Sequence, residues 1–406
     1  MRRFQLLSIS NTSKTIAITS LLSFSMQIVF ALLMLHWFTP KEVGEFSVIS
    51  QIAFFWMTLA LAQAPLTFLA NIQHPPQQAA RKAWYSTLLR GVCFMPFVAL
   101  ALWLSHVNLL PAFAWILIIA FFQMTWLLAQ SFLLRTGSTL QHALVRILPP
   151  MAAAFFAMLG TWLAWDGPTL LISAMLGYAI GAWGLTSAWH DTPSHSINTK
   201  IDATSAIQQA DNRGSMLRMS HTLTDALLAT AIVIVWQRCY GAEETGWMTA
   251  LLRVLGFVPS VLHMAWAQVK LSRGTEHPDN SQEWILAIVG CCVVLSLIAF
   301  CHLGLYRSWL SQHWLGVLNY VWPLAAWQSA ACVCAAFSHR PFQTNSETKY
   351  SWACIGTAML QSLALLAPLT FTESWDVAAH VQLFAATSTV GLFTLAFWMT
   401  TLRSDR

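Results

Sequence analysis

The stretch that decides the fold runs from Arg218 to Lys270 and reads RMSHTLTDALLATAIVIVWQRCYGAEETGWMTALLRVLGFVPSVLHMAWAQVK. Two apolar segments flank a short polar hairpin, Arg238 to Thr245, and the second segment carries Arg253 about halfway along. Each segment has about 20 residues, enough to cross a bilayer core as a helix. An arginine facing lipid at mid-span would cost about 2.5–3.5 kcal/mol. Arg253 is therefore predicted to face a polar interior or a charged partner.

The first of these segments contains an acidic residue, Asp225. Intramembrane carboxylates are rare and mark ion pathways or pair with other groups. We interpret Asp225 as the candidate for coupling transport to a proton or cation, with a structural ion pair to Arg253 as the alternative. His221 lies one turn earlier on the same helix face. The His221/Asp225 spacing also resembles an acyltransferase motif, but no second catalytic cluster accompanies it.

The composition is that of a polytopic membrane protein. Of 406 residues, 57% are hydrophobic and 9% charged, and the mean hydropathy is +0.58, whereas soluble domains carry roughly 25% charged residues. The net charge of +5 does not indicate nucleic-acid binding, because the basic residues are scattered between apolar segments. The eight cysteines lie mostly inside apolar runs. They are interpreted as small apolar residues, with no disulfide framework, metal site or cofactor expected.

The hydropathy pattern predicts an all-α fold of twelve transmembrane helices. The apolar runs are continuous and too long for barrel strands. They lie at 15–38, 45–68, 84–105, 112–134, 145–165, 169–189, 219–237, 246–268, 284–305, 315–337, 351–371 and 379–401.

The basic residues predict the orientation. With both termini on one side, that side receives 16 lysines and arginines and the other receives only Lys41, Arg238 and Arg307. Arg90 and Arg253 fall inside spans. Because positive charge collects in cytoplasmic loops, both termini are predicted to be cytoplasmic.

One long polar loop, about 191–215, divides the chain into two halves. The predicted organisation is a six-helix bundle at 1–190, a cytoplasmic linker at 191–217 and a second six-helix bundle at 218–406. The halves are also related in sequence. TPKEVGEFSVISQIAFFWM at 39–57 aligns with GAEETGWMTALLRVLGFVP at 241–259, which puts Gln51 opposite Arg253. Internal repeats of this kind place a substrate site at their interface near the midplane.

The segments FTPKEVGEFSVISQ and YGAEETGWMTALLRVLGFVPSV, with the twelve-span layout, resemble the Wzx-type polysaccharide flippases. These belong to the MATE-like multidrug/oligosaccharidyl-lipid/polysaccharide (MOP) superfamily. The resemblance implies two six-helix bundles in a V around a central cavity, in the bacterial inner membrane. It implies transfer of undecaprenyl-diphosphate-linked oligosaccharides to the periplasmic leaflet by alternating access, for O-antigen or capsule-like polymers. Partners would be the lipid-linked glycan, the bilayer, and a glycan polymerase with its chain-length machinery.

Arginine suits a diphosphate because its planar fork bonds two oxygens at once. Family members line the cavity with basic residues, and Arg253 stands at such a place, while the first half has the neutral Gln51 there. Further candidates for substrate binding are Arg90, which could instead snorkel to the surface, and Arg146, which could instead mark the inner interface. Polar residues within spans could bond sugar hydroxyls or hold helices together: Gln27, Gln51, Gln63, Gln123, Gln130, Asn319, Gln328 and Gln361.

Two other functions compete with the flippase. A MATE-like cation-coupled drug antiporter would carry acidic and aromatic groups in its site, whereas the mid-span charge here is basic. A membrane glycan polymerase or acyltransferase would need a large outward loop or a clustered catalytic group, and the sequence shows neither.

Overall fold

The computed structural model describes residues 22–23, 25–62, 64–70, 75–137, 139–165, 167–189, 212–273, 281–344, 346–370 and 375–402. Gln63 and most of the predicted linker, 191–211, lie outside these residues. Every regular element within the described ranges is helical. After a first helix, Ser25–Trp37, come α2 (Pro40–Leu61), α3 (Ala64–Ala70), α4 (Pro76–Cys93), α5 (Met95–Ser105), α6 (Leu109–Thr136), α7 (Thr139–Trp162), α8 (Thr169–Ala182), η1 (Trp183–Trp189), α9 (Asn212–Arg273), α10 (Ser281–Tyr306), η2 (Gln312–Val317), α11 (Leu318–Phe337), α12 (Arg340–Gln343), α13 (Glu347–Thr370) and α14 (Val377–Thr401).

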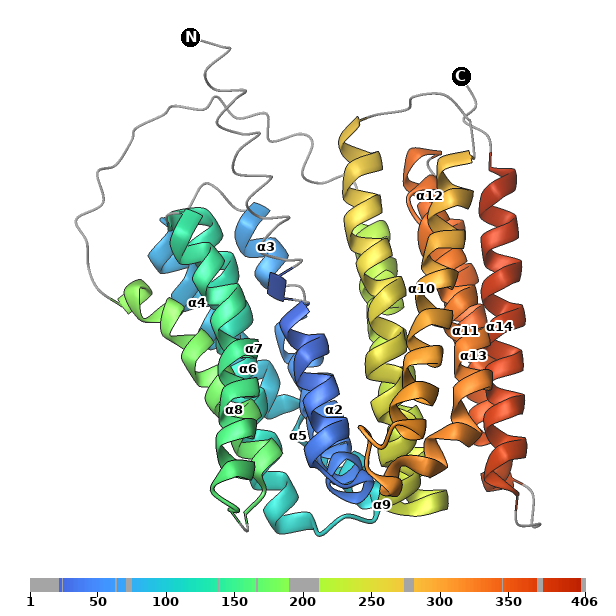
Figure 1. Cartoon of the computed structure of the whole chain (residues 1–406). Helices are drawn as coiled ribbons and strands as arrows, with labels where there is room; N and C mark the ends of the chain where they lie inside the picture. The colour runs from blue at the N-terminus through green and yellow to red at the C-terminus, as the bar shows by residue number, and fades with distance from the viewer. Residues whose placement is uncertain are drawn as a thin grey trace.

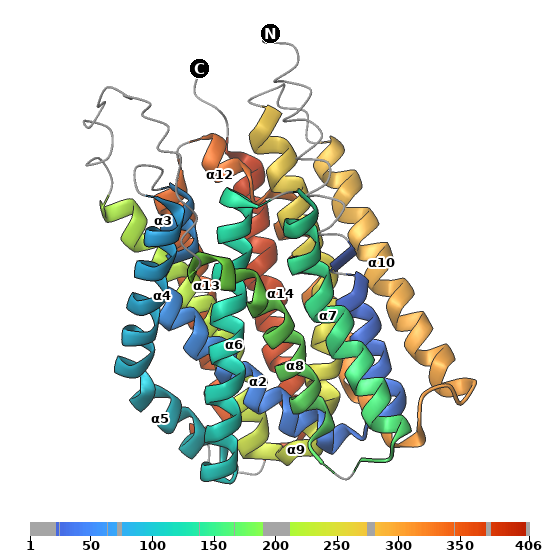
Figure 2. The same cartoon turned by 90° about the vertical axis from the view of Figure 1, so that its left-hand side faces the viewer.

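The fold class is confirmed. Nine helices within the described residues are long and apolar enough to cross a membrane. The pair α4 and α5 is bent by 48° next to Pro96, in the first turn of α5, and counts as a tenth span if the two helices are taken together (Figure 2). The short apolar helix Ser25–Trp37 and the division of α9 into two limbs are consistent with the expected twelve.

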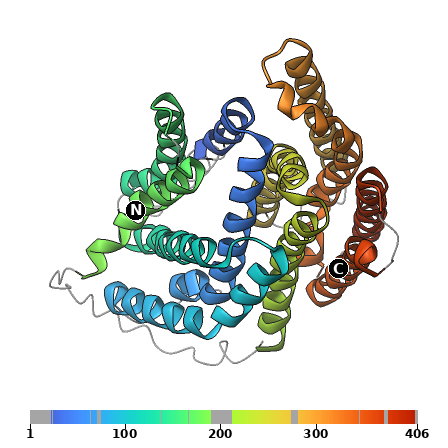
Figure 3. The ribbon, with the colours of Figure 1, turned by 90° about the horizontal axis from the view of Figure 1, so that it is seen from below.

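The helices form two bundles, one of α2 to α8 and one of α9 to α14 (Figure 1). One end of the molecule carries Arg81, Arg135, Lys270 and Arg340, and we call it the basic end. The other carries the turns around Thr39, Gly241 and Ser308, and we call it the hairpin end. Seen from the hairpin end, α2 runs beside α9 between the two bundles (Figure 3). The bundles are wider apart at the basic end (Figure 1).

The expected polar hairpin at 238–245 is wrong in detail. α9 is helical on both sides of a single non-helical residue, Gly241, whose φ of 85° and ψ of −176° glycine adopts without a Cβ penalty. One glycine therefore turns the chain where eight loop residues were expected. α9 also begins at Asn212, so the last residues assigned to the linker are helical.

At the hairpin end the two repeats contact each other through equivalent residues. A side-chain carbon at Gly44 would overlap the backbone carbonyl of Ala242. One at Gly246 would overlap the carbonyl of Pro40. The sequence offset between repeats, 202 residues, pairs Gly44 with Gly246 and Pro40 with Ala242. The contact is therefore reciprocal, as at an isologous dimer interface.

The next helical turn continues this symmetry. Thr249 Oγ1 donates to Ser47 Oγ at 2.9 Å, and these residues are again 202 apart. Both side chains are buried. Helices in lipid approach closely where small residues meet, because hydrocarbon gives no hydrophobic drive for association. The glycine pair and this hydroxyl pair thus hold α2 and α9 together on the pseudo-two-fold axis.

Indole and imidazole groups close the hairpin end around this axis. His36 Nδ1 lies 2.8 Å from the carbonyl oxygen of Trp309. Trp314, 1% exposed, donates its Nε1–H to the carbonyl of Phe38 at 3.2 Å. Each contact joins one bundle to the other, so the hairpin end is tied at several points.

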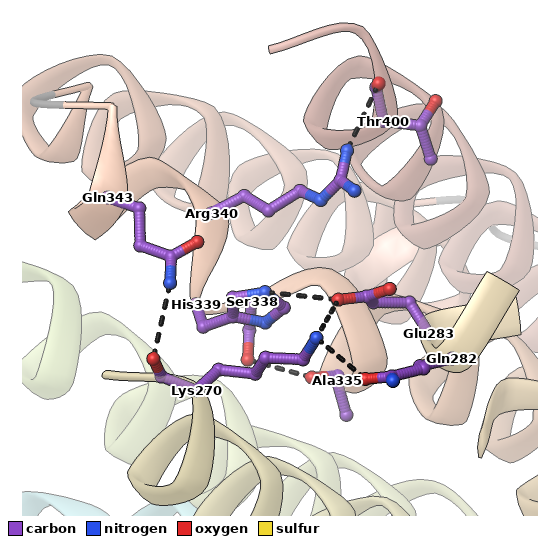
Figure 4. Close-up of polar contacts among 9 residues, drawn as sticks. All are labelled: Lys270, Gln282, Glu283, Ala335, Ser338, His339, Arg340, Gln343 and Thr400. Carbon is purple, nitrogen blue, oxygen red and sulfur yellow. Dashed lines mark hydrogen bonds and ion pairs between the residues drawn. The ribbon is translucent and has the colours of Figure 1, made fainter. Parts of the chain in front are cut away.

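The second bundle is held together at its basic end by a polar cluster (Figure 4). Glu283 is 2% exposed. Its Oε1 forms an ion pair with Lys270 Nζ at 3.1 Å and lies 3.5 Å from His339 Nε2. Arg340 donates to the carbonyl of Thr400 at 3.3 Å. The cluster links the ends of α9, α10, α12 and α14. Removing one partner of such a buried pair typically costs about 3–5 kcal/mol.

Candidate functional site

A cavity of about 640 Å³ lies between the two bundles. Its walls come from the first helix, α2, α6, α7 and α8 on one side and from the second limb of α9 on the other. The volume falls within the range of about 300–1,000 Å³ typical of sites for small ligands and head groups. Among the described residues, Arg253 is the one charged side chain that lines it, and no carboxylate does so.

Arg253 is held in the cavity wall by uncharged neighbours. Its Nη2 donates to Ser50 Oγ at 3.1 Å, and its Nη1 lies 3.5 Å from the Met34 sulfur. Its guanidinium carbon stands 4.7 Å from the centroid of the Phe46 ring. A guanidinium has five N–H donors, so further donors remain for a ligand. The cation–π contact orients the group without neutralising its charge.

Gln51 also lines the cavity, from α2. Its Nε2 donates to Thr230 Oγ1 of α9 at 3.4 Å. The structure thus brings Gln51 and Arg253, the predicted pair at equivalent repeat positions, into one cavity. Each makes a hydrogen bond to the other bundle.

Arg90 does not reach the cavity. Its Nε donates to the carbonyl of Ala60 at 2.8 Å and its Nη2 to that of Leu61 at 3.1 Å. These carbonyls belong to the last turn of α2, where helical acceptors lack partners and a cation is favoured. Arg90 therefore caps α2, which sequence spacing alone does not reveal.

Arg146 lies on α7 just before Pro149 and Pro150, which line the cavity, but its own side chain is not among the lining groups. Its backbone carbonyl accepts a hydrogen bond from Ser23 Oγ at 2.9 Å. The residue stands between the cavity and the basic end of α7.

Asp225 pairs with His221 and not with Arg253. The distance from His221 Nε2 to Asp225 Oδ2 is 3.2 Å, and the Asp225 side chain is 60% exposed. The two residues considered for the ion pair differ in height. Asp225 lies 16 residues before the break at Gly241 and Arg253 only 12 after it, about 6 Å along the helix axis at 1.5 Å per residue. Arg253 bonds Ser50 of α2, so the ion pair considered as the alternative role for Asp225 does not form.

Two aromatic residues of the cavity wall were not predicted. Trp126 of α6 and Tyr178 of α8 have ring centroids 5.3 Å apart. The available signal was the G-x-x-x-G spacing of Gly177 and Gly181, which marks close helix packing in membranes. A Cβ at Gly181 would overlap the Trp126 indole, and one at Gly177 would stand 2.7 Å from the Pro149 carbonyl.

The arrangement of two helical bundles with a cavity between them is found in several solved membrane proteins. The lipid II flippase MurJ in an inward closed conformation shares the fold with a TM-score of 0.63 and 12% identity, over 95% of this chain and 87% of that chain. An inward-facing multidrug resistance MATE transporter of the MOP superfamily gives 0.57 and 11%, over 94% and 93%. A eukaryotic MATE transporter gives 0.55 and 12%, over 97% and 94%.

The sequence itself matches no family model and no curated protein. At these identities the likeness is one of fold. That fold is shared by a lipid flippase and by multidrug transporters alike.

Proposed function

We propose that this protein is a flippase that moves undecaprenyl-diphosphate-linked oligosaccharides from the cytoplasmic to the periplasmic leaflet of a bacterial inner membrane, for surface polysaccharide synthesis. The observation that carries the proposal is the charge of the cavity. Its one charged lining group among the described residues is Arg253, and the neighbours of that group are neutral. Such a site favours an anionic head group, which a guanidinium can bind through two hydrogen bonds at once.

The cavity also suits the rest of the cargo. Amide side chains of Gln27, Gln51 and Gln123 line it together with apolar groups. Amides can donate to and accept from sugar hydroxyls without adding charge. The polyisoprenoid tail needs no site of its own because it remains in the bilayer. A glycan polymerase and chain-length machinery are the proposed consumers of the product.

Transport would proceed by alternating access, with both termini in the cytoplasm. The positive-inside rule assigns the basic end to the cytoplasm. The hairpin end, closed by the Gly44/Gly246 and Trp314/Phe38 contacts, would then face the periplasm. These contacts must part for release, and the wider basic end must close.

The second candidate is a cation-coupled drug antiporter, favoured by the shared fold with MATE transporters. A cationic drug would be repelled by Arg253, and no described carboxylate lines the cavity to attract it. Asp225 remains the proposed coupling residue for either function. Asp225→Asn should slow an ion-coupled transporter while leaving its membrane abundance unchanged.

The test is substitution of Arg253 in a strain that lacks the gene, read as surface glycan relative to membrane abundance. Arg253→Ala should lose the anion site, which weakens cargo binding by about 10- to 100-fold for a charged hydrogen bond. Arg253→Lys should retain part of the function because it keeps the charge and loses the fork. Arg253→Glu should be the most severe.

The matched control is Arg238→Glu, an exposed arginine on the same helix at the hairpin end. It should leave glycan display unchanged. Normal glycan display with Arg253→Glu would refute the proposed function. If deleting the gene makes the strain sensitive to a cationic drug and no lipid-linked sugar accumulates, the result would favour the antiporter.

A further inference from the structure

The cavity wall formed by the first bundle contains a buried hydrogen-bond acceptor that has no partner among the described residues. Gln123 of α6 lines the cavity and is only 9% exposed. Its Oε1 accepts no hydrogen bond from any described residue. Leaving a buried acceptor unsatisfied costs about 1–3 kcal/mol. A group that enters the cavity and donates a hydrogen bond to this oxygen is therefore favoured.

Next to this amide the wall is aromatic. Trp126 follows Gln123 by three residues, so both occupy one face of α6. Trp126 Nε1 donates to the carbonyl of Val145 at 2.7 Å. That bond uses the one N–H donor of the indole, so the ring offers a ligand only its apolar faces. The Tyr178 ring lies at 5.3 Å and 35° to it.

The packing of α6, α7 and α8 fixes this aromatic pair in place. Gly181 of α8 provides the space that the indole occupies, since any side chain there would overlap it. Gly177, one turn earlier, admits the Pro149 carbonyl of α7. The wall is thus preformed by backbone contacts and does not depend on flexible loops.

A single acceptor beside two aromatic faces suits one class of ligand. A pyranose ring carries hydroxyl or acetamido N–H donors around its edge and apolar C–H groups on its faces. It could donate to Gln123 Oε1 while a face rests on Trp126 or Tyr178. An anion would be disfavoured by the amide oxygen, and a cation by Arg253 across the cavity.

Resting on the proposed function, we infer that Gln123, Trp126 and Tyr178 form a subsite for the sugar that is attached to the diphosphate. The cargo would then bridge the cavity, with its diphosphate on the second bundle at Arg253 and its first sugar on the first bundle. Neither wall alone provides both contacts. Full affinity therefore requires the two bundles to stand as they do in this structure.

Binding to the purified full-length protein in detergent tests the subsite with two probes, undecaprenyl diphosphate and the same lipid carrying one N-acetylglucosamine. Gln123→Met keeps the length of the side chain and removes the acceptor. It should raise the Kd of the glycosylated probe about tenfold, the value of one hydrogen bond, and leave that of the bare probe unchanged. Thr125→Val, on the outer face of α6, is the control and should change neither.

The outcomes separate the two proposals. Equal effects of Gln123→Met on both probes, or no effect on either, would overturn the sugar subsite while leaving the flippase intact. If the unmodified protein binds neither probe, or if Arg253→Ala weakens neither, the proposed function itself falls. Tighter binding of ethidium than of either probe, weakened by Trp126→Leu, would show that the aromatic wall serves a cation instead.

Discussion

The two segments that meet at the hairpin end, 39–57 and 241–259, are equivalent in sequence and position but only partly equivalent in their contacts. On the axis, Gly44 and Gly246 meet each other's backbone reciprocally, and Ser47 bonds Thr249. Toward the cavity the equivalence ends. The contacts that close the hairpin end are thus alike in the two repeats, whereas the cavity is lined by the neutral Gln51 from one repeat and by Arg253 from the other.

The glutamates at the start of the two segments also differ. Glu42 Oε2 accepts from the Thr39 backbone N–H at 2.8 Å, and Glu42 N–H donates to Thr39 Oγ1 at 3.3 Å, which is a capping box. The equivalent Glu244 instead accepts from the hydroxyl of Tyr320 in α11. Glu42 therefore stabilises the N-terminus of its own helix, α2, whereas Glu244 connects α9 to α11 of the same bundle.

The largest loss of transport should come from replacing either axial glycine with alanine, which adds a methyl group where α2 meets α9. Gly44→Ala and Gly246→Ala should each prevent closure of the hairpin end, because the new Cβ meets backbone that no side-chain movement can relieve. An overpacking cost of about 1–3 kcal/mol in the closed state would slow transport by about 5- to 160-fold. Both variants should lose activity equally. Gly356→Ala, whose Cβ would meet nothing within 4 Å, is the control.

Cross-linking reports the same closure directly. In a cysteine-free background, Ser47→Cys with Thr249→Cys should form a disulfide on treatment with a copper–phenanthroline oxidant, because the parent oxygens are 2.9 Å apart. The yield should fall when Gly44→Ala is added. Normal transport with an undiminished yield in the alanine variants would show that the glycine contact is not needed for closure.

A smaller effect is expected from moving the charge between repeats. Gln51 and Arg253 line the same cavity from equivalent positions. Gln51→Arg combined with Arg253→Gln should recover part of the glycan display that Arg253→Gln alone loses. The recovery should be incomplete because Ser50 and Phe46 orient the native guanidinium. No recovery, with both variants abundant in the membrane, would mean that the position of the charge matters as much as its presence.

The smallest effects should distinguish the two glutamates. Glu42→Ala removes the hydrogen bond from the Thr39 N–H to the Glu42 carboxylate and should lower stability by about 0.5–1.5 kcal/mol, without coupling to Tyr320→Phe. Glu244→Ala and Tyr320→Phe should instead be non-additive, with a coupling of about 0.5–3 kcal/mol. Each pair of substitutions forms a double-mutant cycle, which is measured by the midpoint of thermal unfolding in detergent. Additive losses for the Glu244/Tyr320 pair would contradict the distinct role of the second glutamate.

The sequence predicted the features that depend on local pattern. Continuous apolar runs predicted the helical spans, and the alignment of residues 39–57 with 241–259 located the segments that meet on the axis. The same alignment brought Gln51 and Arg253 to equivalent positions, which the structure places in one cavity. These inferences needed only the length of a membrane-spanning helix, the free-energy cost of a charge that faces lipid, and the alignment of the two repeats.

The features that were missed depend on contacts between distant helices. Arg90 looked like any intramembrane arginine until the last turn of α2 was found beside it. An ion pair between Asp225 and Arg253 was an open alternative because their segments adjoin in sequence, but the two residues lie at different heights along α9 and bond other groups. Trp126 and Tyr178 are two of many aromatic residues, and nothing local distinguishes them. At 238–245 the polar residues suggested a loop, but the non-helical φ and ψ of one residue, Gly241, are enough to turn the chain.

The reciprocal contact at Gly44 and Gly246 has an evolutionary consequence. A six-helix ancestor assembled as a symmetric dimer would place every cavity residue twice, so its charges could come only in pairs. Joining two copies in one chain preserves the shared axis contact and frees each copy to change alone. Among the described residues Arg253 is the one charged group that lines the cavity, and the equivalent position holds Gln51, an asymmetry that no symmetric dimer of identical chains can reach. Duplication followed by fusion would thus have made an odd number of charges, and a cargo with two unlike ends, accessible to this cavity.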